Sequence, residues 1–494
     1  MCRIKAEGRQ VAESSHAPTA ESSAQRITAV FDEPELMLAG KRLYVDIMLI
    51  TPPLILYCNI LPIYLAKALS LTSLQAFHDM ALFVMVLSCL SLKKMSQLSA
   101  NYKIPLLCAL SVAIYSAYTA AIGQFGQREY FFALAFLPYF YLRWLDAHAG
   151  VRFARILFLA TLVCSFMACL KPHFFFPILV YEIYLCFKGS RRNSLFLALL
   201  APPTFYLLHF LFLPPEIRRV FWSEHVPFVL DRYYTFGFPW FVFRHALLRS
   251  LIFLIFIALG RRSTRPADQI LVPIALTGLA CLAIAIFQGM GFSYHFIPMD
   301  FLLCFGIPVL FGTLRKSWMG FATAALVLAL LGRSVFHQSL VPRLAHDRAL
   351  IMDELEQLTQ PGEKIMLFTS NITYLYPAIL LYGLQPGTRY LNYFPIAFFN
   401  NTKDRRQLLA THYPQPSELE PAEKIFVKRV ADDLKSYKTT WLFFPKPATL
   451  MNLFVAPEFD SFEYFKSTGL LAQIQEHYNL AVDDENFLIF RYRE

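Results

Sequence analysis

The sequence predicts an α-helical polytopic membrane protein, with about ten or eleven membrane-spanning helices and a C-terminal extracytoplasmic α/β domain. Only 16% of the 494 residues are charged and 56% are hydrophobic, whereas soluble domains carry about 25% charged residues. Apolar runs recur along the chain, and each is long enough, or nearly long enough, to cross a bilayer. These runs cover residues 47–70, 73–92, 104–122, 130–145, 154–170, 172–187, 194–213, 245–260, 269–288, 295–313 and 317–334.

The segments between the runs alternate in charge after residue 92, which predicts the orientation of the chain. One set holds 14 Lys or Arg residues and the other set holds six. Because basic loops stay in the cytoplasm, the second set is expected outside, together with the tail that follows the last run. The net charge of +10 reflects this bias and does not indicate a nucleic-acid partner. The more basic segments are 93–103, 143–155, 188–192, 261–265 and 314–316.

Three regions follow from these patterns. Residues 1–30 are polar and are expected to be disordered, and residues 31–334 form the transmembrane domain. Residues 335–494 place a helix pattern before a strand pattern three times, as in "VKRVADDLKSY" followed by "TTWLFFP". This order predicts a partly parallel sheet that is covered on its faces. The tail contains no cysteine and no phosphate-binding loop, zinc pattern or nucleophile elbow.

The predicted outer segments hold most of the unusual polar residues of the transmembrane domain. Ionisable residues near a bilayer are costly, so they indicate a functional site. Together they would form a cationic cup that suits a phosphate or diphosphate, with arginine as a bidentate clamp. The residues are Gln127, Arg128 and Glu129 in "QFGQREYFF", Lys171 and His173 in "LKPHF", Arg218 and Arg219 in the segment 214–244, and Tyr294 and His295 in "GFSYHF".

Simpler roles remain open for the same residues. Arg128 and Glu129 could pair with each other and anchor a helix end, and Lys171 could reach toward the interface. In the functional interpretation, Glu129 holds the Arg128 guanidinium so that it faces the cup. Asp79, Glu182 and Asp300, which lie inside helices, are expected to hold the bundle together.

Carboxylates precede the first apolar run. Asp32, Glu33 and Asp46 lie before a double proline, and they join the cup only if this segment is also outside. A basic phosphate cup beside a carboxylate suggests glycosyl transfer from a lipid phosphate, with the carboxylate as general base on the acceptor hydroxyl.

These residues also carry a family resemblance. The stretch "FDE…GKRLYVDIMLITPPL" resembles the first outer loop of GT-C-fold membrane glycosyltransferases. The stretches "FGQREYFFALAFLPY", "LKPHFFFPILVYEIYL" and "GFSYHFIP" are similar to motifs of an uncharacterised bacterial branch of that group. The resemblance implies a GT-C-like bundle over residues 31–334, in the bacterial inner membrane and in contact with membrane lipids. It also implies an inverting glycosyltransferase that moves a sugar from a polyprenyl-phosphate donor to an envelope glycan or lipid acceptor.

The resemblance assigns roles to the residues of the cup. Asp32, Glu33 and Asp46 would be catalytic, whereas Glu129, Tyr294, Arg218 and Arg219 would support the site. The group differs in its need for a divalent metal, and no cluster of metal ligands in the sequence decides the question. Gln127, Arg128, Lys171, His173 and His295 would bind the donor phosphate.

The chain departs from the group in two places. Tyr130 stands where the branch has a histidine, and no spanning helix is visible before Asp32. If residues 47–70 span the membrane instead, the three carboxylates lie across the bilayer from the cup. A transporter or flippase of lipid-linked glycans, or a relative without catalytic activity, therefore remains an alternative.

Overall fold

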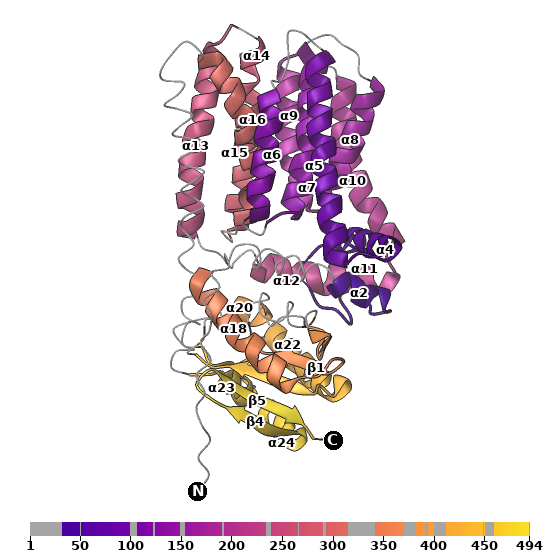
Figure 1. The fold of residues 1–494 in the computed structure, drawn as a ribbon, viewed down its shortest axis with the longest axis vertical. Coiled ribbons are helices and arrows are strands. Elements are labelled where there is room, and N and C mark those ends of the chain that lie inside the picture. Colours follow the sequence, from indigo (N-terminus) through magenta and orange to yellow (C-terminus); the bar gives the residue numbers. More distant parts are fainter. Residues whose placement is uncertain are drawn as a thin grey trace, which may run out of the picture.

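The computed structural model has three parts along its long axis: a helical bundle, a layer of short helices and a C-terminal α/β domain (Figure 1). The predicted disordered segment 1–30 and the apolar run 317–334 lie outside the described residues. The structure describes residues 32–49, 51–98, 106–121, 124–148, 154–189, 192–233, 239–264, 266–289, 293–314, 341–369, 379, 382–390, 394–399, 412–447, 449 and 459–493.

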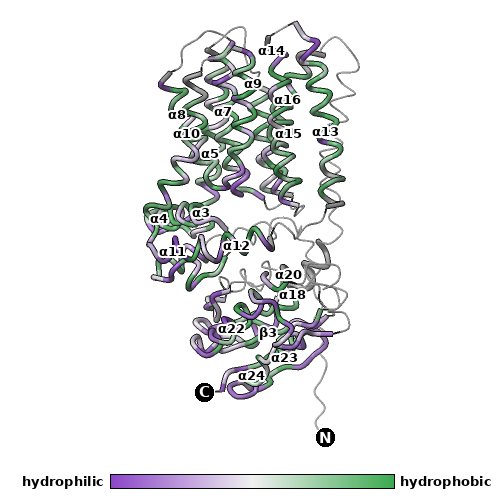
Figure 2. Tube along the Cα trace, turned by 180° about the vertical axis from the view of Figure 1, so that it is seen from behind, coloured by the Kyte–Doolittle hydropathy of each residue, from purple (hydrophilic) through white to green (hydrophobic). Residues whose placement is uncertain are grey.

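The apolar runs after residue 72 form the helices of the bundle wherever the structure describes them. Successive helices run alternately toward and away from the C-terminal domain, which lies beyond one end of the bundle (Figures 1 and 2). The segments predicted to be outside therefore lie at the end nearer this domain, as expected. The helices are α5 (Ser73–Leu98), α6 (Leu106–Ala121), α7 (Arg128–His148), α8 (Ala154–Ala168), α9 (Phe175–Phe187), α10 (Arg192–Phe212), α13 (Pro239–Arg262), α14 (Pro266–Gln269), α15 (Leu271–Gln288) and α16 (Ile297–Leu314).

Two of the described helices are both long enough and apolar enough to cross a membrane on their own. These are Ser73–Met95 within α5 and Leu271–Gln288, which is α15. Most of α15 is buried by its neighbours, as the core helix of a soluble protein would be. The established architecture is thus a mostly helical protein with a C-terminal mixed sheet.

The first apolar run does not form one straight helix. It gives α3 (Pro53–Cys58) and α4 (Ile60–Leu69), which lie with the layer of short helices and not within the bundle (Figure 2). Proline begins α3, and Asn59 separates the two helices. The alternative in which residues 47–70 span the bundle is therefore wrong, and Asp46 lies at the same end of the bundle as Arg128.

The layer of short helices lies between the bundle and the C-terminal domain (Figure 1). A hairpin of residues 41–48, here called the N-terminal hairpin, closes through a bridge between Leu43 and Ile47. Tyr44 of this hairpin is 1% exposed and stacks 4.6 Å from His225. The layer contains α2 (Asp32–Leu38), α3, α4, α11 (Pro215–Val220), η3 (Phe221–His225), α12 (Val226–Phe228) and η4 (Val229–Tyr233).

The C-terminal domain contains the predicted partly parallel sheet, in the order β2-β1-β3-β5-β4. β1 pairs in parallel with β2 and β3, whereas β5 is antiparallel to β3 and β4. Two strands were not predicted from the sequence: β2, which has only two residues, and β4, which is mostly exposed. The strands are β1 (Lys364–Leu367), β2 (Gln385–Pro386), β3 (Trp441–Pro445), β4 (Tyr478–Asp483) and β5 (Phe487–Tyr492).

Helices cover both faces of this sheet. Successive side chains along a strand point to opposite faces, and the side chains on both faces are buried. Leu442 and Phe444 of β3 face α22 (Pro421–Tyr437), α23 (Ser461–Ser467) and α24 (Leu471–His477). Trp441 and Phe443 face α18 (Val341–Leu358) on the other side. The sequence expectation of a sheet with two covered faces is confirmed.

Among the described residues, several contacts attach the C-terminal domain to the layer. The backbone N–H of Met48 donates to the carbonyl of Arg389 over 2.8 Å. Arg429 of α22 pairs with Glu224 of η3 at 2.5 Å. The ring of Phe228 lies 6.1 Å from that of Phe399 in α20 (Phe394–Phe399).

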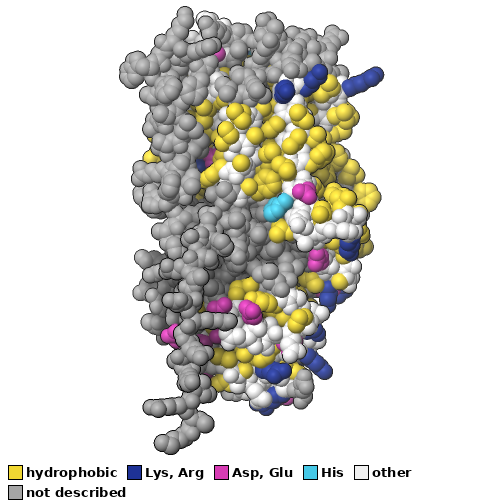
Figure 3. Space-filling view, in the orientation of Figure 1, with side chains coloured by type: hydrophobic (Ala, Val, Ile, Leu, Met, Phe, Trp, Pro, Cys, Tyr) yellow, Lys and Arg dark blue, Asp and Glu magenta, His cyan; other side chains and the backbone are white. Residues whose placement is uncertain are grey.

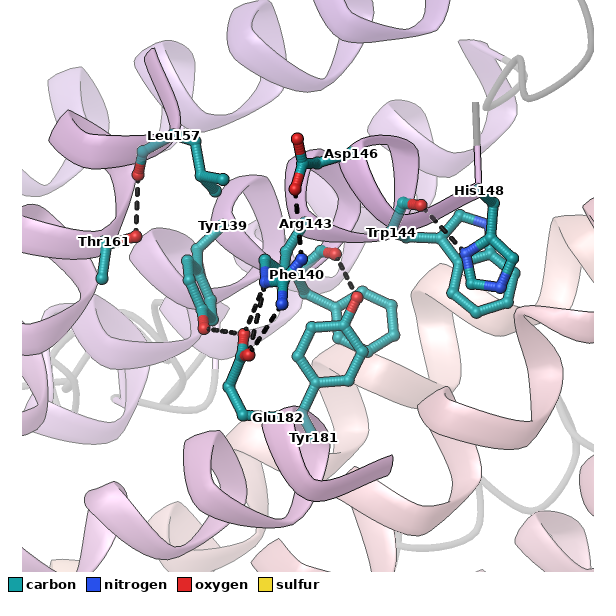
Figure 4. A network of polar contacts seen from close by, with 10 residues as sticks. All are labelled: Tyr139, Phe140, Arg143, Trp144, Asp146, His148, Leu157, Thr161, Tyr181 and Glu182. Atoms are coloured by element: carbon teal, nitrogen blue, oxygen red, sulfur yellow. Dashed lines mark hydrogen bonds and ion pairs between the residues drawn. The ribbon is translucent and has the colours of Figure 1, made fainter. Parts of the chain in front are cut away.

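A buried ion pair ties α7 to α9 near the end of the bundle far from the C-terminal domain (Figure 4). Arg143 and Glu182 are both fully buried, with Nε of Arg143 3.0 Å from Oε1 of Glu182. Tyr139 donates to the same carboxylate, and Asp146 accepts from Nη1 of Arg143. The sequence analysis counted Arg143 among the loop residues, which is wrong because it lies inside α7. Glu182 and Asp300 do hold the bundle together, Asp300 through Arg249 at 2.7 Å.

We expect Gly126→Ala to destabilise the protein more than Gly189→Ala. Both glycines have left-handed backbones, with φ of +76° and +79°, so alanine would cost about 1–2 kcal/mol at either position. A Cβ at Gly126 would also overlap the ring of Phe77, whereas open space surrounds Gly189. Overpacking adds about 1–3 kcal/mol. Thermal unfolding of the purified variants should show the larger loss for Gly126→Ala, and equal losses would contradict the overlap.

Candidate functional site

Several predicted site residues lie where helices begin, at the end of the bundle that faces the C-terminal domain. Arg128 is the first residue of α7, and Lys171 immediately precedes η2 (Pro172–Phe174), which leads into α9. His295 lies in η5 (Ser293–Phe296), which leads into α16. Because the N-terminus of a helix carries partial positive charge, this arrangement favours an anion.

Lys171 is the centre of a buried polar network. Its Nζ lies 2.5 Å from Oε1 of Glu129 and donates to Oε1 of Gln288 over 3.1 Å. Nε2 of Gln288 is in turn 3.0 Å from Nε2 of His173. Lys171 is 6% exposed and Glu129 is 1% exposed. A buried lysine remains charged only with such a partner, so Glu129 holds both the position and the charge of the ammonium.

The expected pairing of Glu129 with Arg128 is wrong, because Glu129 contacts Lys171 instead. The two residues are neighbours at the start of α7 and leave it in different directions, which separates their side chains. Within the described part of the chain, the half-buried Arg128 side chain makes no hydrogen bond or ion pair. Its charge is nevertheless close enough to act on Lys171, His173 and Tyr44. Arg128 is therefore a cation beside the network that has a free guanidinium.

Tyr294 and His295 complete one side of the cluster. Their rings are 4.5 Å apart, and Nζ of Lys171 lies 5.5 Å from the centre of the Tyr294 ring. His295 is 4% exposed, and the charges of Lys171 and Arg128 reach it. The structure thus brings together Arg128, Glu129, Lys171, His173, Tyr294 and His295 out of the residues that were predicted to lie on one side of the membrane. We refer to Arg128, Glu129, Lys171, His173, Gln288, Tyr294 and His295 as the basic cluster.

Burial lowers the pKa of Lys171 to about 8, while the adjacent Glu129 opposes this shift and Arg128 adds to it. Lys171 is therefore mostly protonated at neutral pH and loses its charge as the pH rises through about 8. If an anion binds at the basic cluster, its affinity should fall over the same pH range. Binding of a lipid-phosphate donor, measured by titration from pH 6 to 9.5, should show this loss. Lys171→Met should bind more weakly without the step near pH 8, and an unchanged step would contradict the assignment.

The candidate carboxylates lie in the layer and not in the basic cluster. Asp46 accepts two hydrogen bonds from the Arg42 guanidinium, at 2.9 and 3.1 Å, and Arg42 also pairs with Glu216 of α11. This contact lowers the pKa of Asp46. Burial raises the pKa of Glu33 to about 8. Asp32 is the first residue of α2, and its side chain lies outside the described part.

The remaining predicted residues have peripheral positions. The carbonyl of Gln127 accepts from the backbone N–H groups of Tyr130 and Phe131, so Gln127 starts α7. Arg218 and Arg219 lie in the last turn of α11, in the layer. In the described part of the chain, the side chains of these three residues form no hydrogen bond or ion pair with the basic cluster.

Sequence reasoning missed two residues of the region. Gln288 is an amide residue at the end of the apolar run 269–288. A polar residue at this position could have been predicted to belong to the site. Tyr44 has φ of +63°, a left-handed backbone that is rare for a bulky residue, and its hydroxyl donates to the carbonyl of Thr51 over 2.6 Å. Such strain is often found at functional sites, but no sequence pattern predicts it.

No protein-family model matches the chain, and no curated protein matches it. In the described residues, no group of three or more His, Cys, Asp or Glu side chains could hold a metal ion. The chemistry that these side chains themselves allow is binding of an anion by Arg128 and Lys171, with carboxylates nearby in the layer.

Proposed function

We propose that the protein is a GT-C-like membrane glycosyltransferase of the bacterial inner membrane. It would transfer a sugar from a polyprenyl-phosphate donor to an envelope glycan or lipid at the outer face. The observation that carries the proposal is the basic cluster, in which the free guanidinium of Arg128 lies beside a buried and charged Lys171. A guanidinium and an ammonium at converging helix starts suit a phosphate group.

Insertion in a membrane is supported by where the exposed apolar side chains lie. On the face shown in Figure 3, hydrophobic side chains cover the described part of the bundle, and the Lys and Arg side chains seen on the bundle lie at its end far from the C-terminal domain. Among the described C-terminal residues, Ile425 and Leu480 are the large hydrophobic residues that are exposed. Contiguous exposed apolar surface of this kind marks a membrane or an interface. The exposed residues of the bundle include Phe83, Leu87, Leu90, Leu159, Phe187, Leu200, Leu211, Leu251 and Phe287.

Short helix α4 supports the same orientation. Leu61, Tyr64 and Leu69 are each more than half exposed, although α4 lies beside the end of the bundle. An amphipathic helix with exposed leucine and tyrosine suits the boundary between lipid headgroups and acyl chains. We place the outer membrane surface at the layer, so that the basic cluster opens near the headgroups.

In the proposed glycosyl transfer, cationic residues bind the phosphate and a carboxylate acts as the base. The acceptor hydroxyl attacks the anomeric carbon of the donor sugar, and the bond between that carbon and the phosphate oxygen breaks. Arg128 binds the phosphate as its negative charge increases, and Lys171 adds a second positive charge. A carboxylate takes the hydroxyl proton. Glu33, with a pKa of about 8, is the stronger base once ionised but is mostly protonated at neutral pH, whereas Asp46 is ionised there and is hydrogen-bonded to Arg42.

The test is an assay of purified protein in proteoliposomes with radiolabelled polyprenyl-phosphate sugars and an extract of envelope acceptors. Transfer of label to an acceptor, and its loss in an Arg128→Ala variant that inserts normally, would support the proposal. Movement of the donor between leaflets without transfer would instead identify a flippase. Binding of the donor with neither transfer nor movement would identify a relative without catalytic activity.

A further inference from the structure

A second basic region lies where the N-terminal hairpin meets the C-terminal domain. It is a pocket of about 350 Å³, within the usual range of small-ligand sites. Two of its residues come from the hairpin, one begins β1, one follows β2 and two end α22. The lining residues are Lys41, Asp46, Lys364, Arg389, Ser436 and Tyr437. None of them belongs to the basic cluster.

Two ammonium groups face this pocket without a carboxylate partner. Nζ of Lys364 donates to the backbone carbonyl of Tyr437 over 2.9 Å, which leaves two of its three N–H donors. Nζ of Lys41 lies 5.2 Å from the centre of the Tyr437 ring, and Lys41 is otherwise exposed. In the described part of the chain, neither lysine forms an ion pair.

The acidic groups of the pocket are already matched by arginines. Asp46 is held by Arg42, whose guanidinium contacts both carboxylate oxygens. Asp433, below the pocket, accepts from Nε of Arg389 at 2.8 Å and from the backbone N–H of Arg389 at 2.9 Å. These contacts fix the guanidinium of Arg389, which lines the pocket, and Nη1 is not among the atoms that contact Asp433. Arg42 also pairs with Glu216, so Lys41, Arg42, Lys364 and Arg389 together exceed the carboxylates Asp46, Glu216 and Asp433 by one positive charge.

We propose that this pocket binds a phosphate monoester or diphosphate group of a ligand. Lys41 and Lys364 supply the charge, Arg389 supplies an oriented N–H donor, and Ser436 supplies a hydroxyl. Residues from the hairpin and from the C-terminal domain both contact the ligand, so binding draws the two parts together. The pocket does not depend on the proposed glycosyl transfer, and its occupancy can be measured without any activity.

The test is lysine labelling of the full-length protein with an amine-reactive reagent, read by mass spectrometry with inorganic pyrophosphate as the probe. Pyrophosphate should slow the labelling of Lys41 and Lys364 several-fold, while the exposed Lys428 of α22 serves as the control. The double variant Lys41→Gln/Lys364→Gln should bind pyrophosphate at least tenfold more weakly in an Arg128→Ala background, because each lost charged contact is worth roughly tenfold. The Arg128→Ala background weakens binding at the basic cluster, and the labelling of Lys41 and Lys364 reports on the second pocket itself.

A second arm distinguishes the source of the phosphate. Protein in nanodiscs that contain phosphatidic acid is compared with protein in phosphatidylcholine nanodiscs, without pyrophosphate. Protection by soluble pyrophosphate alone identifies a soluble phosphate, and protection by phosphatidic acid identifies a lipid headgroup. Absence of protection by either probe would overturn the proposal. Equal protection of Lys428 would do so as well, because it would show general charge screening.

Discussion

Arg128→Lys is expected to lower turnover of a polyprenyl-phosphate sugar by a factor on the order of 10²–10³, the usual cost of losing one oriented donor. Lysine keeps the charge but loses the planar fork that contacts two phosphate oxygens at once. The Arg128 side chain makes no contact with described residues that lysine would break, so folding and insertion should persist. Turnover is measured under saturating donor, with insertion checked by size-exclusion profile and thermal unfolding.

Arg219→Lys is the matched control for this substitution. Arg219 is exposed on α11, at the same end of the bundle but outside the basic cluster, so its replacement should leave turnover unchanged. Full activity in well-inserted Arg128→Lys protein would refute the phosphate role. Arg128 would then serve only to anchor the start of α7.

Glu182→Ala is expected to destabilise the protein by about 3–5 kcal/mol, because it leaves the Arg143 guanidinium buried without its main partner. Tyr139 would lose its acceptor in the same variant (Figure 4). Asp146, which is mostly buried, remains as an acidic partner at 3.2 Å. Thermal or chemical unfolding in detergent measures the effect.

Two further variants test the cause of this loss. Glu463→Ala breaks an exposed pair with Lys466 and should cost at most about 0.5 kcal/mol. The double variant Arg143→Met/Glu182→Leu removes both charges and should recover most of the stability, since apolar replacements of buried pairs are often neutral. If the double variant is as unstable as Glu182→Ala, packing rather than the unpaired charge determines the loss.

The sequence patterns predicted the parts of the fold that depend on periodicity. The apolar runs marked the described helices of the bundle, and the helix-then-strand order marked the C-terminal sheet. The patterns were ambiguous at residues 47–70, because hydrophobicity alone does not distinguish a span from a broken segment. In the structure, Pro53 begins α3 and Asn59 separates α3 from α4, and both short helices pack in the layer.

The sequence predicted at which end of the bundle the site residues lie, but it did not predict which of them contact each other. Alternating loop charge placed Arg128, Lys171 and His295 at one end of the bundle, where the structure has them. The partner of Glu129 depends on how α7 packs against the turn before η2, and the sequence separation of 42 residues carries no local signal for it. Because Arg128 is next to Glu129 in the sequence, it was predicted to be the partner of Glu129. In the structure, tertiary packing makes Lys171 that partner.

The hydrogen bond between Met48 and Arg389 also has a consequence for the order of events during synthesis. The hairpin that carries Asp46 leaves the ribosome early, but its partner strand segment is made more than three hundred residues later. At about 5–20 residues per second, the hairpin waits roughly 20–70 s for that partner. A nascent chain that stops before residue 389 therefore has its helical bundle, and its hairpin contacts the layer but not the C-terminal domain. The surroundings of the Asp46 carboxylate are complete only in a nearly finished polypeptide.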